Sequence, residues 1–310
     1  MPRQSGGPAG SGDESGAEAL ARLYDLDVAE EDGDLGLYLA LAARTRGPIL
    51  ELMAGSGRVA IPLARTGRRV VAVDLDPAML ARARGAADAA GGRAARRLEL
   101  VDADVHGYRH PDAGRFGLAI VALGSLLLLP GRAAQRAVFT TLVAHLAPGG
   151  VAVVDVPLLD ADDLSRYDGR LTLDWVRHGP DGSVVTKTSS ARHDATARTV
   201  ALVSIFEEGL PGREVARTVR VDRLHLLDAV DVREMAEDAG LRVEILAGDA
   251  DLTPLAPGAD RAILVAVRDG DDAGRPPGRS ARRRVSGGGG GTSGGGGGTS
   301  GAPGRSRGAW

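Results

Sequence analysis

Short apolar runs alternate with longer amphipathic stretches through most of the chain, and this alternation constrains the fold more than any other feature. Strand-length apolar runs that are each followed by a helix-length stretch are typical of βαβ units around a parallel sheet. We therefore expect strands at residues 49–53, 69–74, 98–101, 118–123 and 151–156, with helices at 58–65, from Asp76-Pro77 onward and at 133–146.

The alternation changes between residues 157 and 226, where β-rich segments joined by turn signals predict hairpins in series at 171–178, 184–192, 199–207 and 215–225. A helix at 231–239 and strands at 241–246 and 262–267 follow. Because no helix joins the last two strands, one of them should run antiparallel. The prediction is a doubly wound, mostly parallel, seven-stranded α/β sheet with an inserted small antiparallel sheet.

Both ends of the chain differ in composition from the rest. Residues 1–16 are rich in Gly, Ser and Pro, and residues 271–310 are rich in Gly, Ser and Arg, with two runs of five glycines. Such segments bury too little apolar surface to offset their ordering entropy, so we expect disordered termini. This leaves one domain at residues 17–270, with residues 157–226 as a β-rich subdomain.

Composition excludes several classes of function. A formal net charge of -3 and a pI near 6.1 do not provide the basic field of a nucleic-acid-binding protein. The absence of cysteine excludes disulfides, thiolate nucleophiles and cysteine-ligated metals, and the six histidines form no metal-binding spacing. No apolar run approaches a membrane span, and residues 1–16 lack the apolar core of a signal peptide, so we expect a cytoplasmic protein without a metal.

The most informative segment runs from Glu51 to Arg58, Glu-Leu-Met-Ala-Gly-Ser-Gly-Arg, between the first strand and the first helix. Glycines here let the backbone approach a ligand and present helix N-terminal amides to it. The spacing of Gly55, Gly57 and Ala60, with Asp74 ending the next strand, also fits a dinucleotide-binding loop. An NAD(P)-dependent oxidoreductase is therefore an alternative. Against it stand an acid inside the first strand, a third acid after strand three, and no hydride-transfer constellation.

Four segments in order, ILELMAGSGR, VVAVDLDPAML, LVDADV and HLAPGGVAVVDV, resemble the motif series of class I S-adenosylmethionine-dependent methyltransferases over residues 24–268. The resemblance implies a Rossmann-like fold and S-adenosylmethionine as cofactor. It further implies that the methionine moiety is lined by Glu51, Gly55 and Gly57. It also implies that Asp74 accepts both ribose hydroxyls and that Asp104 faces the adenine amino group. These roles suit carboxylates, which offer the acceptors that a vicinal diol needs.

Two positions at the edges of this pattern are less settled. The family often has Gly where this chain has Met53, so the entry to the loop is bulkier. Tyr24-Asp25 resembles an N-terminal Tyr-Asp pair that closes over the sulfonium in many small-molecule methyltransferases. A tyrosine that simply packs a helix on the core is an equal alternative.

The acceptor is less constrained than the cofactor. Leu123-Gly124-Ser125-Leu126 after strand four lacks the Asn/Asp-Pro-Pro-Tyr type of sequence found in DNA-adenine and glutamine-amide methyltransferases. The layout loosely resembles methyltransferases of amino sugars, amines and peptide natural products. It implies a small-molecule or peptide acceptor in specialised metabolism.

We expect an amine acceptor held by acids of the insertion, Asp174, Glu207 and Glu208, unless these are merely solvated positions on a sheet. Trp175 either lines the acceptor pocket or belongs to the core. No histidine carries a catalytic motif, so the sequence assigns no catalytic residue. It also leaves open the oligomeric state and the alternative of a catalytically silent, methyltransferase-like binding protein.

Overall fold

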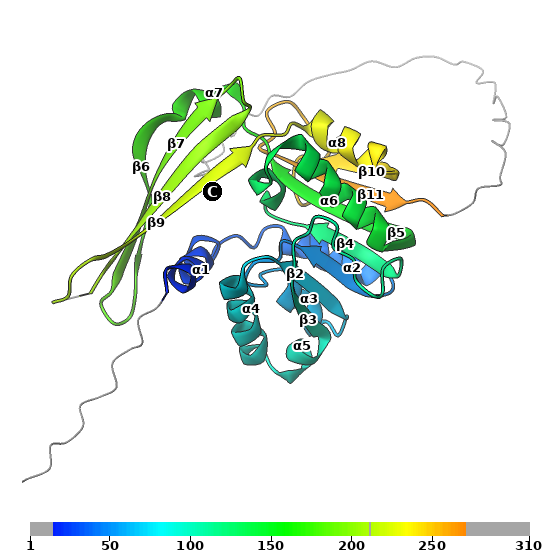
Figure 1. The fold of residues 1–310 in the computed structure, drawn as a ribbon, viewed down its shortest axis with the longest axis horizontal. Coiled ribbons are helices and arrows are strands. Elements are labelled where there is room, and N and C mark those ends of the chain that lie inside the picture. The colour runs from blue at the N-terminus through cyan, green and yellow to red at the C-terminus, as the bar shows by residue number, and fades with distance from the viewer. Residues whose placement is uncertain (1–14, 211, 271–310) are drawn as a thin grey trace, which may run out of the picture. The chain divides into compact units, whose positions relative to one another are not determined.

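The computed structural model describes residues 15–210 and 212–270. Within these ranges the strands form a seven-stranded sheet, ordered β10-β11-β5-β4-β1-β2-β3, and a four-stranded sheet, ordered β6-β7-β8-β9 (Figure 1). The strands of the larger sheet are β1 (Ile49–Leu52), β2 (Val70–Asp74), β3 (Leu98–Asp102), β4 (Phe116–Val121), β5 (Leu146–Pro157), β10 (Leu241–Ala247) and β11 (Arg261–Arg268).

The larger sheet is parallel from β3 to β5, and β11 runs antiparallel to both β5 and β10. This confirms the predicted doubly wound, mostly parallel sheet with a reversed strand at one side. The chain builds outward from β1 to β3 and then returns to place β4 on the other side of β1. Ligands of such sheets bind outside the carboxyl ends of the strands, where the order reverses.

Helices cover the large sheet on both faces, which explains why every residue of β1 and β4 is buried. On one face, α2 (Leu35–Arg44) and α3 (Ala60–Arg65) share a hydrophobic cluster with Ile49, Ile120 and Val153. Asp76 caps α4 by accepting from the N–H of Ala78 at 2.8 Å, as its sequence predicts. The remaining helices of this part are α4 (Pro77–Ala89), α5 (Gly92–Arg97), α6 (Gly131–His145) and α8 (Ala229–Asp238).

The junction between α6 and β5 differs from the prediction. We expected a helix to Leu146, a turn at Pro148-Gly149-Gly150 and a strand from Val151. Instead β5 begins at Leu146, which pairs with Phe116, and its register shifts before Val151 pairs with Leu118. Gly149, with φ near 75°, absorbs the irregularity, so the glycines interrupt the pairing without ending the strand.

The N-terminal helix begins inside the range that was predicted to be disordered. Helix α1 (Gly16–Asp27) is preceded by Ser15, whose hydroxyl accepts from the N–H of Glu18, while the Glu18 carboxylate accepts from the N–H of Ser15. This capping box, together with buried Ala21 and Leu23, orders the helix. The prediction was therefore wrong at residues 15 and 16, and residues 1–14 and 271–310 lie outside the described residues.

The four-stranded sheet is antiparallel throughout and lies close to the positions predicted for its hairpins. A short helix that the sequence did not indicate, α7 (Ala161–Arg166), precedes it. Its strands are β6 (Asp168–His178), β7 (Val184–Asp194), β8 (Thr199–Gly209) and β9 (Ala216–His225).

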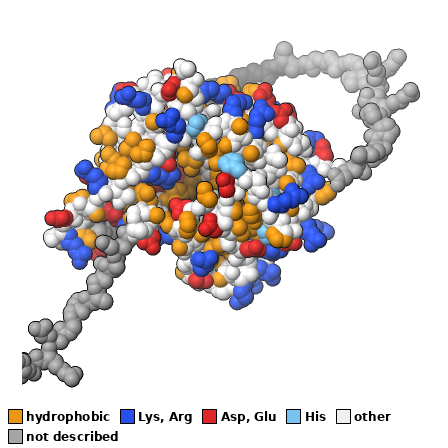
Figure 2. Space-filling view, in the orientation of Figure 1, with side chains coloured by type: hydrophobic (Ala, Val, Ile, Leu, Met, Phe, Trp, Pro, Cys, Tyr) orange, Lys and Arg blue, Asp and Glu red, His pale blue; other side chains and the backbone are white. Residues whose placement is uncertain are grey.

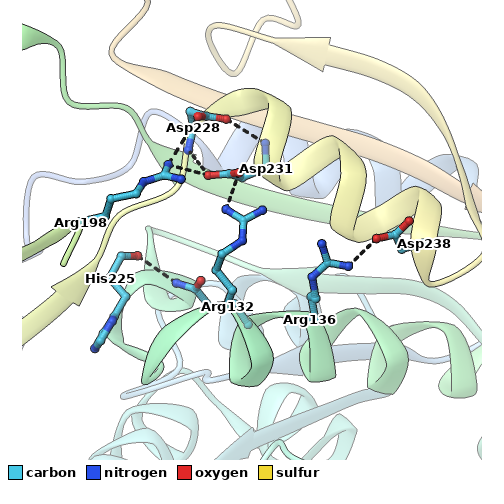
Figure 3. A network of polar contacts seen from close by, with 8 residues as sticks. Arg132, Arg136, Arg198, His225, Asp228, Asp231 and Asp238 are labelled. Carbon is cyan, nitrogen blue, oxygen red and sulfur yellow. Dashed lines mark hydrogen bonds and ion pairs between the residues drawn. The ribbon is translucent and has the colours of Figure 1, made fainter. Parts of the chain in front are cut away.

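Ion pairs attach one end of the four-stranded sheet to α8 and α6 (Figure 3). Arg198, in the turn between β7 and β8, donates to Asp231 at 2.7 Å, and Arg132 of α6 pairs with the same carboxylate. Asp231 also forms a capping box with Asp228 at the start of α8. One nearly buried carboxylate therefore joins three elements that are far apart in the sequence.

Candidate functional site

The glycine loop, residues 53–58, and Asp74 at the end of β2 meet at the carboxyl edge of the large sheet. Asp74 accepts from the N–H of Gly55 at 2.7 Å with one oxygen and from the N–H of Asp76 at 2.9 Å with the other. Gly57 has φ near 85°, and a Cβ there would lie 3.0 Å from the Ile61 side chain, so the turn requires glycine. The structure thus brings together Gly55, Gly57 and Asp74, as predicted from their spacing.

Glu51 lies beneath this loop on β1 and is buried. Burial raises the pKa of Glu51 to about 8, although Arg58 opposes the shift. Its Oε2 atom has no hydrogen-bond partner within the described residues. Glu51 is thus a buried carboxyl group with an acceptor atom available to a ligand.

Met53 adopts the backbone conformation for which glycine is favoured. Its φ is 57°, in the left-handed region, where a side chain with a Cβ is strained. It is the position at which the resembled methyltransferase motif often has glycine. The loop therefore keeps the glycine-type geometry despite the methionine.

Tyr24 of α1 packs against the glycine loop. A Cβ placed on Gly55 would lie 3.7 Å from the edge of the Tyr24 ring, so the ring lies beside this turn and leaves little room for a side chain there. Burial raises the pKa of Tyr24 to about 12. The neighbouring Asp25 pairs with Arg82 of α4, which holds α1 beside the loop.

Asp104 lies on the same edge of the sheet, two residues beyond β3, but is exposed. Its Oδ1 accepts from the N–H of His106 at 2.8 Å and lies 2.7 Å from His106 Nδ1. These contacts lower the pKa of Asp104, with the backbone hydrogen bond of His106 as the largest cause. Asp104 is therefore a charged surface group with no direct contact to Asp74 or Glu51 among the hydrogen bonds of the described chain.

Sequence reasoning missed Arg58 and Asp34. Arg58 forms a bidentate ion pair with the buried Asp34, with both N–O distances at 2.6 Å, and also donates to the carbonyl of Glu31. Arg58 stands at the end of the glycine-rich segment, and this position could have indicated a role at the site. Asp34 precedes α2 and carries no motif, so its role emerges only from the fold.

Two further buried polar groups were also missed, Tyr38 on α2 and Asp155 on β5. Both carboxylate oxygens of Asp155 and the hydroxyl of Tyr38 lack a hydrogen-bond partner in residues 15–210 and 212–270. Burial raises the pKa of Asp155 to about 6, with Arg261 opposing, and burial followed by Asp155 raises the pKa of Tyr38. The charges of Asp155 and Glu51 both raise the pKa of Tyr38, so these three groups form one electrostatic cluster near the loop.

This cluster tests whether the site fits a cationic cofactor. Buried polar atoms are normally hydrogen-bonded, and an unpartnered oxygen is costly. Here Glu51, Tyr38 and Asp155 together leave acceptor atoms unsatisfied beside a glycine loop. The unpartnered carboxyl oxygens of this cluster fit a ligand that carries a sulfonium and an ammonium group.

The predicted acidic acceptor pocket is wrong, because its three acids do not converge. Glu207 pairs with Arg217, whereas Glu208 forms a bidentate pair with Arg22 of α1. These neighbours on one strand point to opposite faces of the sheet. Asp174 accepts from Ser189 and lies 3.8 Å from Lys187. Each of the three acids therefore already has a hydrogen-bond or ion-pair partner within the chain.

The histidines and Trp175 do not form a catalytic centre. His110 and His145 are buried and joined by a hydrogen bond from the His110 N–H to the His145 ring. Trp175 donates to Asp27 of α1 at 2.9 Å and lies near Phe206. The described residues include no cluster of three or more His, Asp or Glu side chains suited to a metal. Nor do they include a helix long and apolar enough to cross a membrane.

Part of the chain matches a known sequence family. Residues 49–150 match the sequence model of a family described as a methyltransferase domain. A search of curated proteins finds no significant match. The fold is similar to an S-adenosylmethionine-dependent methyltransferase from Clostridium acetobutylicum ATCC 824, with a TM-score of 0.66 and 17% identity, covering 81% of this chain and 98% of that one.

Two further solved structures show the same fold. DesVI of Streptomyces venezuelae has a TM-score of 0.63 and 21% identity, covering 80% of this chain and 98% of its own. The sugar N-methyltransferase KedS8 from Streptoalloteichus sp ATCC 53650 has a TM-score of 0.63 and 20% identity, covering 87% and 99%. Residues 49–150 therefore match a methyltransferase domain, and the chain has the fold of solved S-adenosylmethionine-dependent methyltransferases.

Proposed function

We propose that this protein transfers a methyl group from S-adenosylmethionine to an amine nitrogen of a small molecule or peptide. One observation supports the cofactor assignment. Asp74 accepts a hydrogen bond from the N–H of Gly55 at the carboxyl edge of the sheet, near the point where the strand order reverses, and the buried Glu51 lies beneath them. This arrangement combines a close backbone approach with carboxylates, as a ribose and a sulfonium require.

Each of these residues would bind a different part of the cofactor. Asp74 uses both oxygens on backbone N–H groups, but each carboxylate oxygen has a second lone pair that remains for a ribose hydroxyl. Glu51, Gly55 and Gly57 face the methionine moiety, and Tyr24 closes over the loop. Asp104, the exposed acid at this edge, receives the adenine amino group.

The protein mainly aligns the acceptor with the methyl group and excludes water, and it need not supply a reactive side chain. When bound, the cofactor supplies an electrophilic methyl group on a sulfonium that is already a good leaving group. A neutral amine needs no dedicated base at the moment of attack, provided that its ammonium proton has left beforehand. Such chemistry needs no catalytic histidine, and we propose that residues 157–226 provide the acceptor side. The N-methyltransferase activity in the name of the similar structure KedS8 is consistent with this choice.

Calorimetry with S-adenosylhomocysteine and with NADH tests the cofactor. We expect binding of the first and none of the second, whereas the reverse would favour an oxidoreductase. Asp74→Ala should weaken S-adenosylhomocysteine binding by about 1.5 to 3 kcal/mol, the range for hydrogen bonds to a charged group. The matched control is Asp88→Ala, which removes an exposed acid on α4. Equal affinity of the two variants would remove Asp74 from the site.

Turnover separates an enzyme from a silent binding protein. Incubation with S-adenosylmethionine and panels of amines, alcohols and peptides, followed by mass spectrometry, locates the added methyl group. We expect methylation on nitrogen and a rate that rises with pH towards the pKa of the bound amine. Methylation on oxygen or carbon would reject the amine while leaving the cofactor assignment in place.

A further inference from the structure

The C-terminal part of α6 holds the chain between β3 and β4, residues 105–114, which we call the 105–114 segment. The Thr141 hydroxyl donates to the carbonyl of Val105 at 2.9 Å. One helical turn later, the His145 ring accepts at Nε2 from the N–H of His110, also at 2.9 Å. Both contacts engage the backbone of the segment, so α6 fixes its path.

The hydrogen bonds of His145 require a neutral ring in one tautomer. Its Nδ1 atom lies 2.7 Å from the carbonyl oxygen of Thr141, and because a carbonyl only accepts, Nδ1 carries the proton. Nε2 is then bare, as it must be to accept from the His110 N–H. A proton on Nε2 would set two N–H groups against each other and break this contact.

The surroundings of His145 oppose a positive charge. Figure 2 shows histidine side chains at the molecular surface, whereas His145 is fully buried. Its ring stacks on Tyr108 at 5.3 Å between centroids and meets the Phe116 ring at 5.7 Å. Within the described ranges no carboxylate pairs with it. Burial lowers the pKa of His145 below its ordinary value of 6.5, and His110 and Arg109 lower it further, although the hydrogen bond to Thr141 opposes them.

The acids of this region face His110 instead. Glu99 of β3 lies 3.2 Å from His110 Nε2 and also pairs with Arg69. The N–H of Asp112 donates to His110 Nδ1 at 2.9 Å, and the Asp112 carboxylate lies 3.9 Å from the same atom. A positive charge on His110 therefore has carboxylates nearby, whereas a charge on His145 has none. His145 is the member of the pair whose protonation disrupts the structure.

Asp104 depends on the 105–114 segment for its position. On one side of it, the N–H of Ala103 donates to the carbonyl of Asp74 at 3.0 Å, which fixes the chain to β2. On the other side, Val105 is held by α6, and the Asp104 carboxylate accepts from the N–H of His106. Release of the segment would leave Asp104 fixed on the β2 side alone.

We propose that His145 is a positioning residue, which holds the 105–114 segment on α6 only while its ring is neutral and so places Asp104. The inference rests on the proposed role of Asp104 towards the adenine of the cofactor. Because the docked ring takes a proton less readily than a released one, docking is complete above about pH 6.5 and weakens as the pH falls below it. Mild acid then lowers cofactor affinity through a group that does not touch the cofactor.

Hydrogen exchange of peptides, corrected for the intrinsic rate at each pH, measures release of the segment without any cofactor. Protection of residues 105–114 should fall from about pH 6.5 to 5 in the wild type. It should stay constant in His145→Gln, whose amide oxygen accepts from the His110 N–H but does not titrate. The matched control is His178→Gln, which removes an exposed histidine of β6 and should behave like the wild type.

Calorimetry with S-adenosylhomocysteine connects the segment to the site. Over the same pH range the wild type should lose about fivefold more affinity than His145→Gln, within the tenfold per unit that one proton allows. Glu51 and Asp155 titrate in both proteins, so the difference between them reports on His145. In proteins that also carry Asp104→Ala, this difference should vanish, because the acid through which His145 acts is gone.

Equal protection of the wild type and His145→Gln in acid would overturn the release of the segment. A difference in affinity that persists without Asp104 would overturn the positioning of that acid. Absence of S-adenosylhomocysteine binding at every pH would reject the proposed function and the adenine role of Asp104, while hydrogen exchange would still decide whether His145 holds the segment. Nitrogen NMR of the wild-type ring needs no variant: a proton on Nε2 at neutral pH would reject the proposal.

Discussion

Lys187 of β7 donates to Asp27, the last residue of α1, at 2.6 Å. The second oxygen of Asp27 accepts from Trp175, so the four-stranded sheet holds the end of the helix. Tyr24 lies almost one turn earlier, beside Gly55. Helix α1 therefore connects the four-stranded sheet to the glycine loop, and Figure 1 shows it between β9 and α4. A carboxylate at a helix C-terminus is unfavourable for the helix dipole, which the buried ammonium offsets.

Removal of this ammonium should destabilise the protein. Lys187→Met leaves Asp27 largely buried with only the indole as a partner, and we expect the free energy of unfolding to fall by about 3 to 5 kcal/mol. Urea denaturation measures the change. Arg170→Met is the control, because it removes a cation from an exposed pair with Asp168 and should have little effect. A similar small effect in both variants would show that the buried pair does not anchor α1.

Met53 offers a test of backbone strain in the glycine loop. Met53→Ala removes the side chain but keeps the strained φ, whereas Met53→Gly removes both. We expect the glycine variant to be more stable than the alanine variant by about 1 kcal/mol, contrary to the usual order in regular structure. Thermal melting of the two variants measures the difference. Alanine as stable as glycine would show that the loop relaxes from the left-handed conformation.

Cofactor affinity should depend on pH through Glu51. The unliganded carboxyl group, with a pKa of about 8, is mostly neutral at pH 7, and a sulfonium favours the charged form. Binding of S-adenosylmethionine should therefore release a proton, and affinity should rise between pH 6 and 8 by at most tenfold per unit for one proton. Calorimetry in buffers of different ionisation enthalpy counts that proton.

Two comparisons isolate the effect. S-adenosylhomocysteine lacks the sulfonium charge, so its affinity should vary less with pH. Glu51→Gln should flatten the dependence for both ligands. The raised pKa also implies that folding stability declines as pH rises from about 4.5 towards 8, because the native state holds the proton that the unfolded chain has lost. A steep pH dependence in Glu51→Gln would assign the proton to another group, with Asp155 the next to test.

Asp231 anchors the end of the four-stranded sheet in Figure 3, where Arg198 and Arg132 share its carboxylate. Asp231→Ala removes both pairs and half of the capping box of α8, and should cost about 2 kcal/mol of stability. Asp238→Ala removes one exposed pair with Arg136 and should melt like the wild type. Chemical denaturation compares them, and equal midpoints would mean that the anchor contributes nothing.

Strands β1 and β4 were predictable because each is an apolar run buried on both faces, whereas the polar cluster of the site was not. Glu51 lies in β1, Gly55 follows it and Asp74 ends β2, and the carboxyl ends of these strands must meet, so the resemblance to the motif series was enough to group them. Tyr38 and Asp155 become neighbours only when α2 packs on the sheet, and neither has a local signal. The opposite directions of Glu207 and Glu208 were, by contrast, readable from strand alternation.

The buried position of Lys187 has a consequence for protein chemistry, because it is the only lysine in the sequence. Amine-reactive reagents should leave this side chain unmodified while α1 is docked on the four-stranded sheet. Acylation at residue 187, quantified by peptide mass spectrometry, then reports the fraction of molecules in which that contact has opened. The chain thus carries a built-in chemical probe of its own N-terminal helix, without any introduced label.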